Sequence, residues 1–244
     1  WVESPSNPLL KIVDLRAVST FAKEHDLITV CDNTFCSPYI QKPIELGFDL
    51  VVHSATKYLN GHSDVVGGIA VCSKERRDLA EQLGFLSNSV GSIMSPFDSF
   101  LVLRSLKTLP VRMQRHCENA AEVASFLQSH EAVSRVYYPG LPDHPNHLVA
   151  KSQMNGFGGM VTAVLKGGLT SATKFLERTE LFTLAESLGG VESLIEHPAI
   201  MTHASIPDEI RKELGIDDGL VRLSVGIESV EDLVRDLDNA LLNL

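Results

Sequence analysis

Residues 49–68 read DLVVHSATKYLNGHSDVVGG, and this stretch decides the fold. It opens on the apolar run 49–53, which predicts a buried strand, and continues into small and hydroxylic residues around Lys57. A nucleophilic lysine needs a fixed backbone and a poorly solvated amine, so that the amine is neutral part of the time. The nearby hydroxyls of Ser54 and Thr56 could bind a phosphate. Taken alone, the pattern also fits a surface lysine that follows a strand.

On both sides of this stretch, helical and strand patterns alternate. Apolar residues recur at helical spacing over 13–25, and the short apolar runs 27–31 and 67–72 predict further strands. Short apolar strands separated by helices or long connections predict a mostly parallel sheet covered on both faces. Two more helices are expected, at 75–86 and 96–106.

The rest of the chain predicts a smaller α/β layer. Pro110 fits the first turn of a long helix. The expected elements are helices at 110–129, 144–153, 170–178 and 229–242 and strands at 134–138, 159–165 and 220–225. We therefore expect an α/β protein with two domains, residues 1–105 and residues 106–244.

Composition narrows the class of protein. The 244 residues are 44% hydrophobic and carry a net charge of −10, which is ordinary for a globular chain and argues against nucleic acid or an anionic membrane as a partner. No apolar stretch approaches the ~18 residues of a membrane span, and no signal peptide is visible. The four cysteines form no CxxC pair and no zinc-like cluster, so no metal site is predicted and a reducing cytoplasm is the default location. Cys31 and Cys72 are expected to be buried thiols.

Two charged residues stand in or beside apolar strands. Asp32 follows the run 27–31, at the strand end where ligands gather in open α/β sheets, and a buried carboxylate there needs a cationic partner. A turn formed by an Asp-Asn pair is the alternative. Arg222 interrupts the run 220–225, and a half-buried arginine prefers a planar anion such as an amino-acid α-carboxylate. An edge strand with the arginine in solvent is the alternative.

The segment ESLGG, residues 186–190, ends in paired glycines. Such a pair permits a tight turn and a close approach of the backbone to a ligand, although a plain surface turn is also common. An amine, a carboxylate, two hydroxyls and an arginine together make up the set that a pyridoxal-phosphate (PLP) enzyme requires.

The same residues resemble a known family. Residues 54–68 are similar to the cofactor-lysine signature of the Cys/Met-metabolism PLP enzymes, which include cystathionine γ-synthases, γ-lyases and β-lyases and methionine γ-lyases. The similarity extends over the segments 3–8, 32–35, 181–190, 198–204 and 222–226. It implies a fold of the aspartate-aminotransferase type (fold type I), in which residues 1–105 belong to the PLP-binding domain and residues 106–244 form the small C-terminal domain.

The resemblance also implies how the cofactor is held. Lys57 binds PLP covalently and then shuttles protons between substrate atoms. Asp32 pairs with the pyridine nitrogen. Ser54 and Thr56 hold part of the phosphate. Tyr58 follows the lysine and is expected to pack in the core.

Substrate recognition falls on other residues by the same resemblance. Arg222 binds the α-carboxylate of a sulfur amino acid, helped by Asn7 and the backbone at Ser187. Glu186 lies near the distal part of the substrate. Cystathionine has a second ammonium that a carboxylate can attract, whereas methionine has only a thioether methyl beside which an unpaired buried carboxylate is costly.

The leading hypothesis is therefore a cystathionine γ-lyase, which converts L-cystathionine to cysteine, 2-oxobutanoate and ammonia by α,γ-elimination. The alternative is a cystathionine γ-synthase, which joins O-succinyl- or O-acetylhomoserine to cysteine. A non-catalytic α/β scaffold is a more distant alternative.

The resemblance carries two further expectations. Family members have an N-terminal arm and a first part of the cofactor domain, for which this chain, beginning at Trp1, has no matching segment. We expect about three-fifths of a subunit. Phosphate contacts that cross between subunits in the family imply a homo-oligomer, a dimer of dimers.

Overall fold

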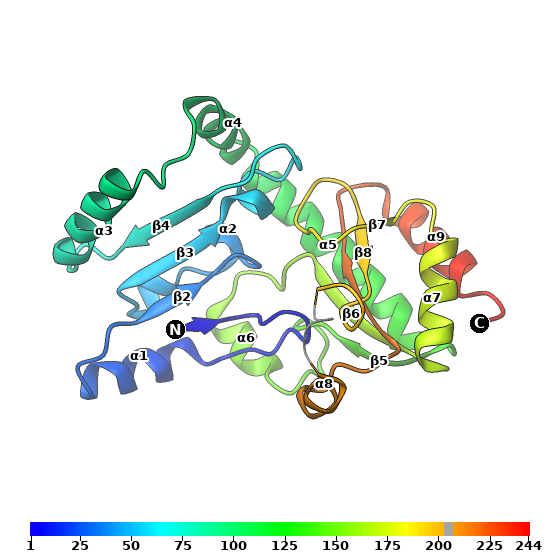
Figure 1. The fold of residues 1–244 in the computed structure, drawn as a ribbon. Coiled ribbons are helices and arrows are strands. Elements are labelled where there is room, and N and C mark those ends of the chain that lie inside the picture. The colour runs from blue at the N-terminus through cyan, green and yellow to red at the C-terminus, as the bar shows by residue number, and fades with distance from the viewer. Residues whose placement is uncertain (203–206) are drawn as a thin grey trace.

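The computed structural model describes residues 1–202 and 207–244 and contains two sheets (Figure 1). The first sheet holds β1–β4 and the second holds β5–β9. The long helix α5 (Leu109–Ser129) lies between them. Its Met113 belongs to the hydrophobic cluster beside the first sheet and its Leu127 to the cluster of the second. Across the described ranges, no helix is long and apolar enough to cross a membrane.

The first sheet is parallel up to its third strand. Its elements are β1 (Val2–Glu3), α1 (Leu15–Glu24), β2 (Val30–Asp32), α2 (Ser37–Ile40), η1 (Pro43–Leu46), β3 (Leu50–Ser54), η2 (Ala55–Leu59) and β4 (Gly68–Cys72). β1 pairs with β2 and β2 with β3, in parallel. The predicted start of β2 is wrong, because Leu27 and Ile28 are each 54% exposed and precede the strand. Apolar character alone did not show that these two residues belong to the connection.

The fourth strand departs from the prediction of parallel pairing. β4 pairs antiparallel with β3, from Leu50 opposite Cys72 to Ser54 opposite Gly68. A parallel return needs a crossover connection that brings the chain back along the sheet, usually a long helix. Here the connection holds only the short η2, so the chain turns back beside β3. Cys31 is buried as expected, whereas Cys72 on this outer strand is only half-buried.

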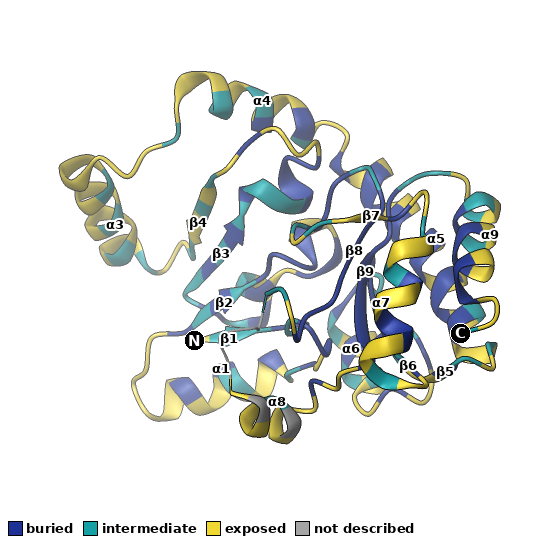
Figure 2. Cartoon of the chain, turned by 45° about the vertical axis from the view of Figure 1, so that its right-hand side comes forward, coloured by how far each residue is buried: buried dark blue, intermediate teal, exposed yellow. Residues whose placement is uncertain are grey.

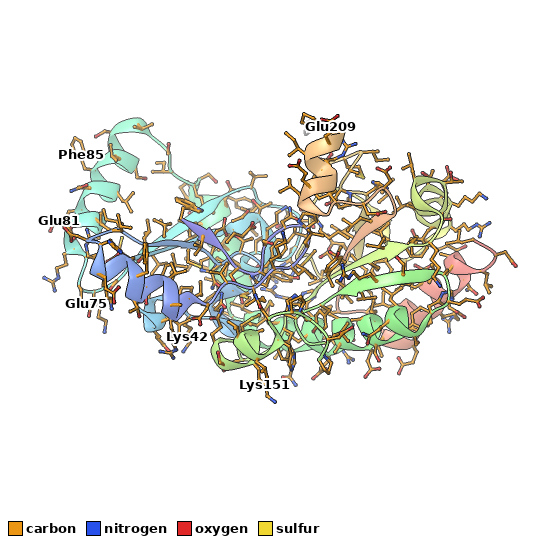
Figure 3. The ribbon with its side chains drawn as sticks, turned by 90° about the horizontal axis from the view of Figure 1, so that it is seen from below. Lys42, Glu75, Glu81, Phe85, Lys151 and Glu209 are labelled. Carbon is orange, nitrogen blue, oxygen red and sulfur yellow. The ribbon has the colours of Figure 1, made fainter. Side chains whose placement is uncertain are left out.

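The outer strand β4 is less covered than expected, because its residues are exposed or half-buried along its whole length. The helices α3 (Arg77–Val90) and α4 (Pro96–Leu106) follow this strand, and within the described structure α3 has no buried residue (Figure 2). Phe85 of α3 is 69% exposed and lies at the outer surface (Figure 3). A group of exposed apolar side chains on neighbouring helices is typical of a site that interacts with another molecule.

The second sheet has the strand order β5-β6-β9-β8-β7 and is largely antiparallel. Its elements are β5 (Val133–Tyr137), α6 (His147–Gln153), β6 (Met160–Leu165), α7 (Gly168–Arg178), β7 (Thr183–Leu184), β8 (Leu194–Glu196), α8 (Asp208–Leu214), β9 (Leu220–Ser224) and α9 (Val230–Leu241). The helices α5, α7 and α9 supply much of its buried core. The α/β class predicted from the sequence is confirmed, but β7 and β8 were missed because strands of two or three residues show no periodicity. The division at residues 105 and 106 stays a prediction.

Candidate active site

Three parallel strands end side by side at one edge of the first sheet. β1 ends at Glu3, β2 at Asp32 and β3 at Ser54. The register places Glu3 directly beside Asp32. Ligands of open α/β sheets bind outside the carboxyl ends of such strands, so this edge is the expected place for a cofactor.

The two carboxylates at this edge form an anionic pair. Burial raises the pKa of Glu3, and the negative charge of Asp32 raises it further, against a hydrogen bond from the Asn7 amide. Asp32 accepts a hydrogen bond from the Thr34 amide at 3.0 Å. A pair of this kind favours a cationic ligand. The sequence interpretation assigned no role to Glu3, since its importance comes from pairing with a strand that is distant in sequence.

Lys57 lies on η2, directly after β3. Its amine donates a hydrogen bond to Ser187 Oγ at 3.0 Å, across a long span of sequence. Partial burial lowers the pKa of Lys57, and the positive charge of Arg222 lowers it further, while Glu196 opposes the shift. A lysine with a lowered pKa has more of the neutral amine that acts as a nucleophile. The interpretation of Lys57 as a plain surface lysine is therefore wrong.

Arg222 lies on the central strand β9, between β6 and β8, and its side chain is 2% exposed. The edge-strand alternative is therefore wrong. One terminal nitrogen donates to Asn7 Oδ1 at 2.8 Å and also contacts Glu196 Oε1 at 2.9 Å. The other donates to the carbonyl oxygens of Glu186 at 3.0 Å and Ser187 at 3.4 Å. The guanidinium thus joins the loop around Ser187 to the segment around Asn7.

Glu196 was missed by the sequence interpretation. It lies directly opposite Arg222 in the antiparallel pair of β8 and β9, and its side chain is 1% exposed. Burial raises the pKa of Glu196, while Arg222 and a hydrogen bond from Thr202 lower it. A single carboxylate in a short apolar segment does not by itself indicate an ion pair. Its partner is identified only by the register of the paired strands.

The predicted phosphate hydroxyls differ in their surroundings. The Ser54 hydroxyl has no hydrogen bond to any residue in the described ranges, whereas its amide donates to Thr34 Oγ1 at 2.9 Å. The Thr56 hydroxyl accepts from the Gly67 amide at 3.1 Å. Ser54 is therefore free to bind an anion, and Thr56 also holds the end of the lysine loop in place. Tyr58 is fully buried, as expected.

The paired glycines approach the lysine segment itself. Gly189 has a φ of +75°, and a Cβ atom there would lie 2.8 Å from the Tyr58 amide nitrogen and 3.2 Å from the carbonyl carbon of Lys57. Its own amide donates to Ser224 Oγ at 2.8 Å. The plain surface turn is therefore excluded, and the close approach that was expected toward a ligand is made to the backbone at Lys57.

We expect Gly189→Ala to displace the lysine segment. An alanine at this positive φ costs about 1–3 kcal/mol, and its methyl group would push on the Lys57 backbone. The free energy of unfolding should fall by that amount, and the dissociation constant for PLP should rise. Gly91→Ala is the control, because Gly91 also has a positive φ but, apart from its chain neighbours, no described residue has an atom within 4 Å of its Cβ position. Equal PLP affinity in the two variants would contradict this prediction.

Comparison with known proteins identifies the family of the chain. The family model for Cys/Met metabolism PLP-dependent enzymes matches residues 1–242. The chain belongs to this family. It is 64% identical over 241 residues to a cystathionine beta-lyase of Coxiella burnetii, covering 99% of this chain and 62% of that protein. It is 54% identical to a cystathionine gamma-lyase of Dictyostelium discoideum (99% and 62% covered) and 55% identical to a cystathionine gamma-synthase of Mycobacterium leprae (99% and 61%).

Solved structures agree with this assignment. Cystathionine gamma-lyase from Lactobacillus plantarum, complexed with L-serine, superposes with a TM-score of 0.94 at 51% identity, over 98% of this chain and 62% of that one. Cystathionine gamma synthase from Xanthomonas oryzae pv. oryzae, in complex with cystathionine, superposes with a TM-score of 0.95 at 53% identity, with the same coverage. Fold type I is thereby confirmed. The chain spans about three-fifths of the length of these relatives.

The residues at the sheet edge fit PLP. Lys57 supplies an amine with a lowered pKa, Asp32 and Glu3 supply negative charge for a protonated ring, and Ser54 supplies an unbonded hydroxyl for a phosphate. The structure brings Lys57 together with Arg222 through the Ser187 loop. Of the segment 198–204 that resembles the family, residues 203 and 204 lie outside the described residues.

Proposed function

We propose that this chain carries the catalytic part of a PLP-dependent lyase that cleaves L-cystathionine by α,γ-elimination. The observation that carries the proposal is the meeting of Lys57 and Arg222 at the Ser187 loop. A nucleophilic amine and a buried guanidinium then both contact Ser187, one at its hydroxyl and the other at its carbonyl oxygen. That arrangement suits an amino acid whose α-carboxylate binds the arginine while its α-carbon lies near the lysine.

The cofactor is held by residues at the strand ends. Lys57 would hold PLP covalently, Asp32 would pair with the ring nitrogen, and the hydroxyls of Ser54 and Thr56 would hold part of the phosphate. When bound, PLP supplies an electron sink that stabilises negative charge at the substrate α-carbon. Glu3 strengthens the preference of Asp32 for a cation, because the two carboxylates are neighbours in the register.

Arg222 positions the substrate and Lys57 moves its protons. The guanidinium is oriented by Asn7 and by the carbonyl oxygen of Ser187, so that it can bind a planar α-carboxylate. The Lys57 amine would remove the proton from the substrate α-carbon. Its one hydrogen bond to a described residue is to Ser187 Oγ, so its flexible side chain can also reach the β-carbon, as α,γ-elimination requires.

Glu186 supports cystathionine as the substrate. Its carbonyl oxygen accepts from Arg222 while its side chain is exposed beside the site. A carboxylate in this position can attract the distal ammonium of cystathionine. Methionine has no such group. Because the Glu186 side chain is exposed and not buried as expected, the preference for cystathionine rests on this attraction and not on the cost of a buried carboxylate beside methionine.

Two other reactions have specific support among the relatives. The protein that is 64% identical is named a cystathionine beta-lyase, and the one that is 55% identical a cystathionine gamma-synthase. Cleavage on the γ side yields 2-oxobutanoate and cysteine, cleavage on the β side yields pyruvate and homocysteine, and a synthase joins a homoserine ester to cysteine.

Product analysis tests the proposal. We expect the PLP-loaded holoenzyme to form 2-oxobutanoate and cysteine from L-cystathionine alone, measured by chromatography of the keto acids and thiols. Pyruvate with homocysteine as the main products would show a β-lyase instead. Cystathionine formation from O-succinyl- or O-acetylhomoserine and cysteine, without cleavage of cystathionine, would show a synthase.

Assembly and location are proposals as well. We propose a homo-oligomer built as a dimer of dimers, because the resemblance implies phosphate contacts from a second subunit. We propose a cytoplasmic location, since the four cysteines are free thiols. Size-exclusion chromatography with light scattering tests the first proposal.

A further inference from the structure

Glu196 is paired with Arg222, the residue to which the α-carboxylate of a substrate would bind. Its Oε1 atom contacts Arg222 at 2.9 Å and accepts from Thr202 Oγ1 at 3.1 Å. Its Oε2 atom is buried and has no hydrogen-bond partner in the described part of the chain. The Nε–H group of Arg222 is likewise buried and unpaired there. The site therefore has one free donor on the cation and one free acceptor on its resident anion.

A second carboxylate changes the charge balance of this pair. Before substrate binds, one guanidinium faces one carboxylate, and both are almost fully buried. A substrate α-carboxylate on the free side of Arg222 would make two buried anions share one cation. Like charges at a shared buried site disfavour ionisation of one of them. Glu196 is the group that can respond, because its Oε2 atom is free to take a proton.

We propose that Glu196 is a positioning residue for Arg222 that takes up a proton when a substrate carboxylate binds. The inference rests on the proposed role of Arg222 in binding that carboxylate. Glu196 would then couple proton uptake to substrate affinity. It would do so from β8, without touching the reacting carbon.

Among the described residues, three charged groups on three different segments affect the ionisation of Glu196. Arg222 on β9 and Lys57 on η2 favour its ionised form, whereas Glu186 on the neighbouring loop disfavours it. A bound carboxylate adds another negative charge and raises the pKa of Glu196 further above its usual range. Affinity for the carboxylate is then constant below the pKa of the free state. It falls by about ten-fold per pH unit between the free and bound pKa values and is constant above them.

The test uses the PLP-loaded holoenzyme and 4-(methylthio)butanoate, a carboxylate without an amino group that cannot bond to the cofactor. Calorimetric titrations in two buffers of different ionisation enthalpy measure the protons taken up. We expect the wild type to take up as much as about one proton more than Glu196→Gln, which keeps the acceptor for Arg222 but cannot gain a proton. The variant should bind several-fold more tightly at high pH, with a flatter pH profile.

Glu228→Gln is the matched control. Glu228 is a half-buried carboxylate that accepts from the amide and hydroxyl of Ser193, at 2.7 and 2.9 Å, and has no contact with Arg222. It should take up as many protons as the wild type. Because Glu196 also raises the pKa of Lys57, the difference in proton uptake is assigned to the Glu196 carboxylate by the spectroscopic measurement that follows.

A second measurement needs no variant. Difference infrared spectra of the wild type, with and without the carboxylate, should show the C=O stretch of a newly protonated buried carboxylic acid. Equal proton uptake by wild type and Glu196→Gln, or the absence of that band while the carboxylate binds, would overturn the inference and leave the role of Arg222 intact. Equal binding of the carboxylate by Arg222→Lys would instead refute the role of Arg222 and, with it, the inference.

Discussion

Lys57→Ala should lose both turnover and the visible absorption band of bound PLP. In the proposed mechanism, the lysine is the covalent anchor of the cofactor and the group that moves substrate protons. One positioned acid–base group contributes roughly 10²–10⁴-fold to a rate, so loss of this role together with the covalent step should lower kcat by about 10⁴-fold or more. The measurements are keto-acid formation from L-cystathionine and the absorption spectrum of the purified holoenzyme.

Lys151→Ala is the control for this substitution. Lys151 lies on α6, is exposed, and extends from the outer surface away from the sheet edge (Figure 3). It should keep the spectrum and the rate of the wild type. Lys57→Arg keeps a positive charge but has no amine that can bond to the cofactor, so it should fail like alanine. Retained turnover in either Lys57 variant would contradict the proposed mechanism, whereas a wild-type protein that shows no visible absorption band of bound PLP would support the non-catalytic scaffold.

Arg222→Met should lose stability and activity for separable reasons. The substitution leaves Glu196 buried and without its cation, and removing one partner of a buried ion pair costs about 3–5 kcal/mol. It also removes the clamp for the α-carboxylate, so KM for cystathionine should rise strongly. Denaturant unfolding and steady-state kinetics measure the two effects.

The double variant Arg222→Met with Glu196→Gln separates them. Replacing the carboxylate by a neutral amide removes the unpaired buried charge, so most of the lost stability should return. Activity should stay low, because no guanidinium is present to bind substrate. Recovery of activity with stability would mean that Arg222 supports the fold and has no direct part in binding.

Single residues show most clearly how much of the candidate site could be predicted from the sequence. Lys57 stood out because hydroxylic and small residues surround it in a pattern that resembles the family, and Asp32 and Arg222 because each is a charge beside apolar strands. Glu3 and Glu196 did not stand out. Each is one carboxylate in a short segment, and each acquires its meaning from the strand that pairs with it.

The helices and strands also differ in how well they could be predicted from the sequence. The helix 229–242 was predicted within one residue of α9 at each end, because its apolar residues recur along one face. The predicted helix 96–106 has the same bounds as α4. The antiparallel direction of β4 was not predicted. Strand direction depends on how the connection returns across the sheet, and that is a property of the packed chain.

The sequence by itself determined the α/β class and the family and singled out Lys57 as the candidate cofactor lysine, because hydrophobic periodicity and a contiguous motif are local properties. Tertiary structure alone decided that Lys57 meets Ser187, that Gly189 touches the lysine backbone, and that Arg222 is shared between Asn7 and Glu196. These contacts join segments far apart in the chain, and their energies depend on distance and burial, which exist only once both sheets have formed.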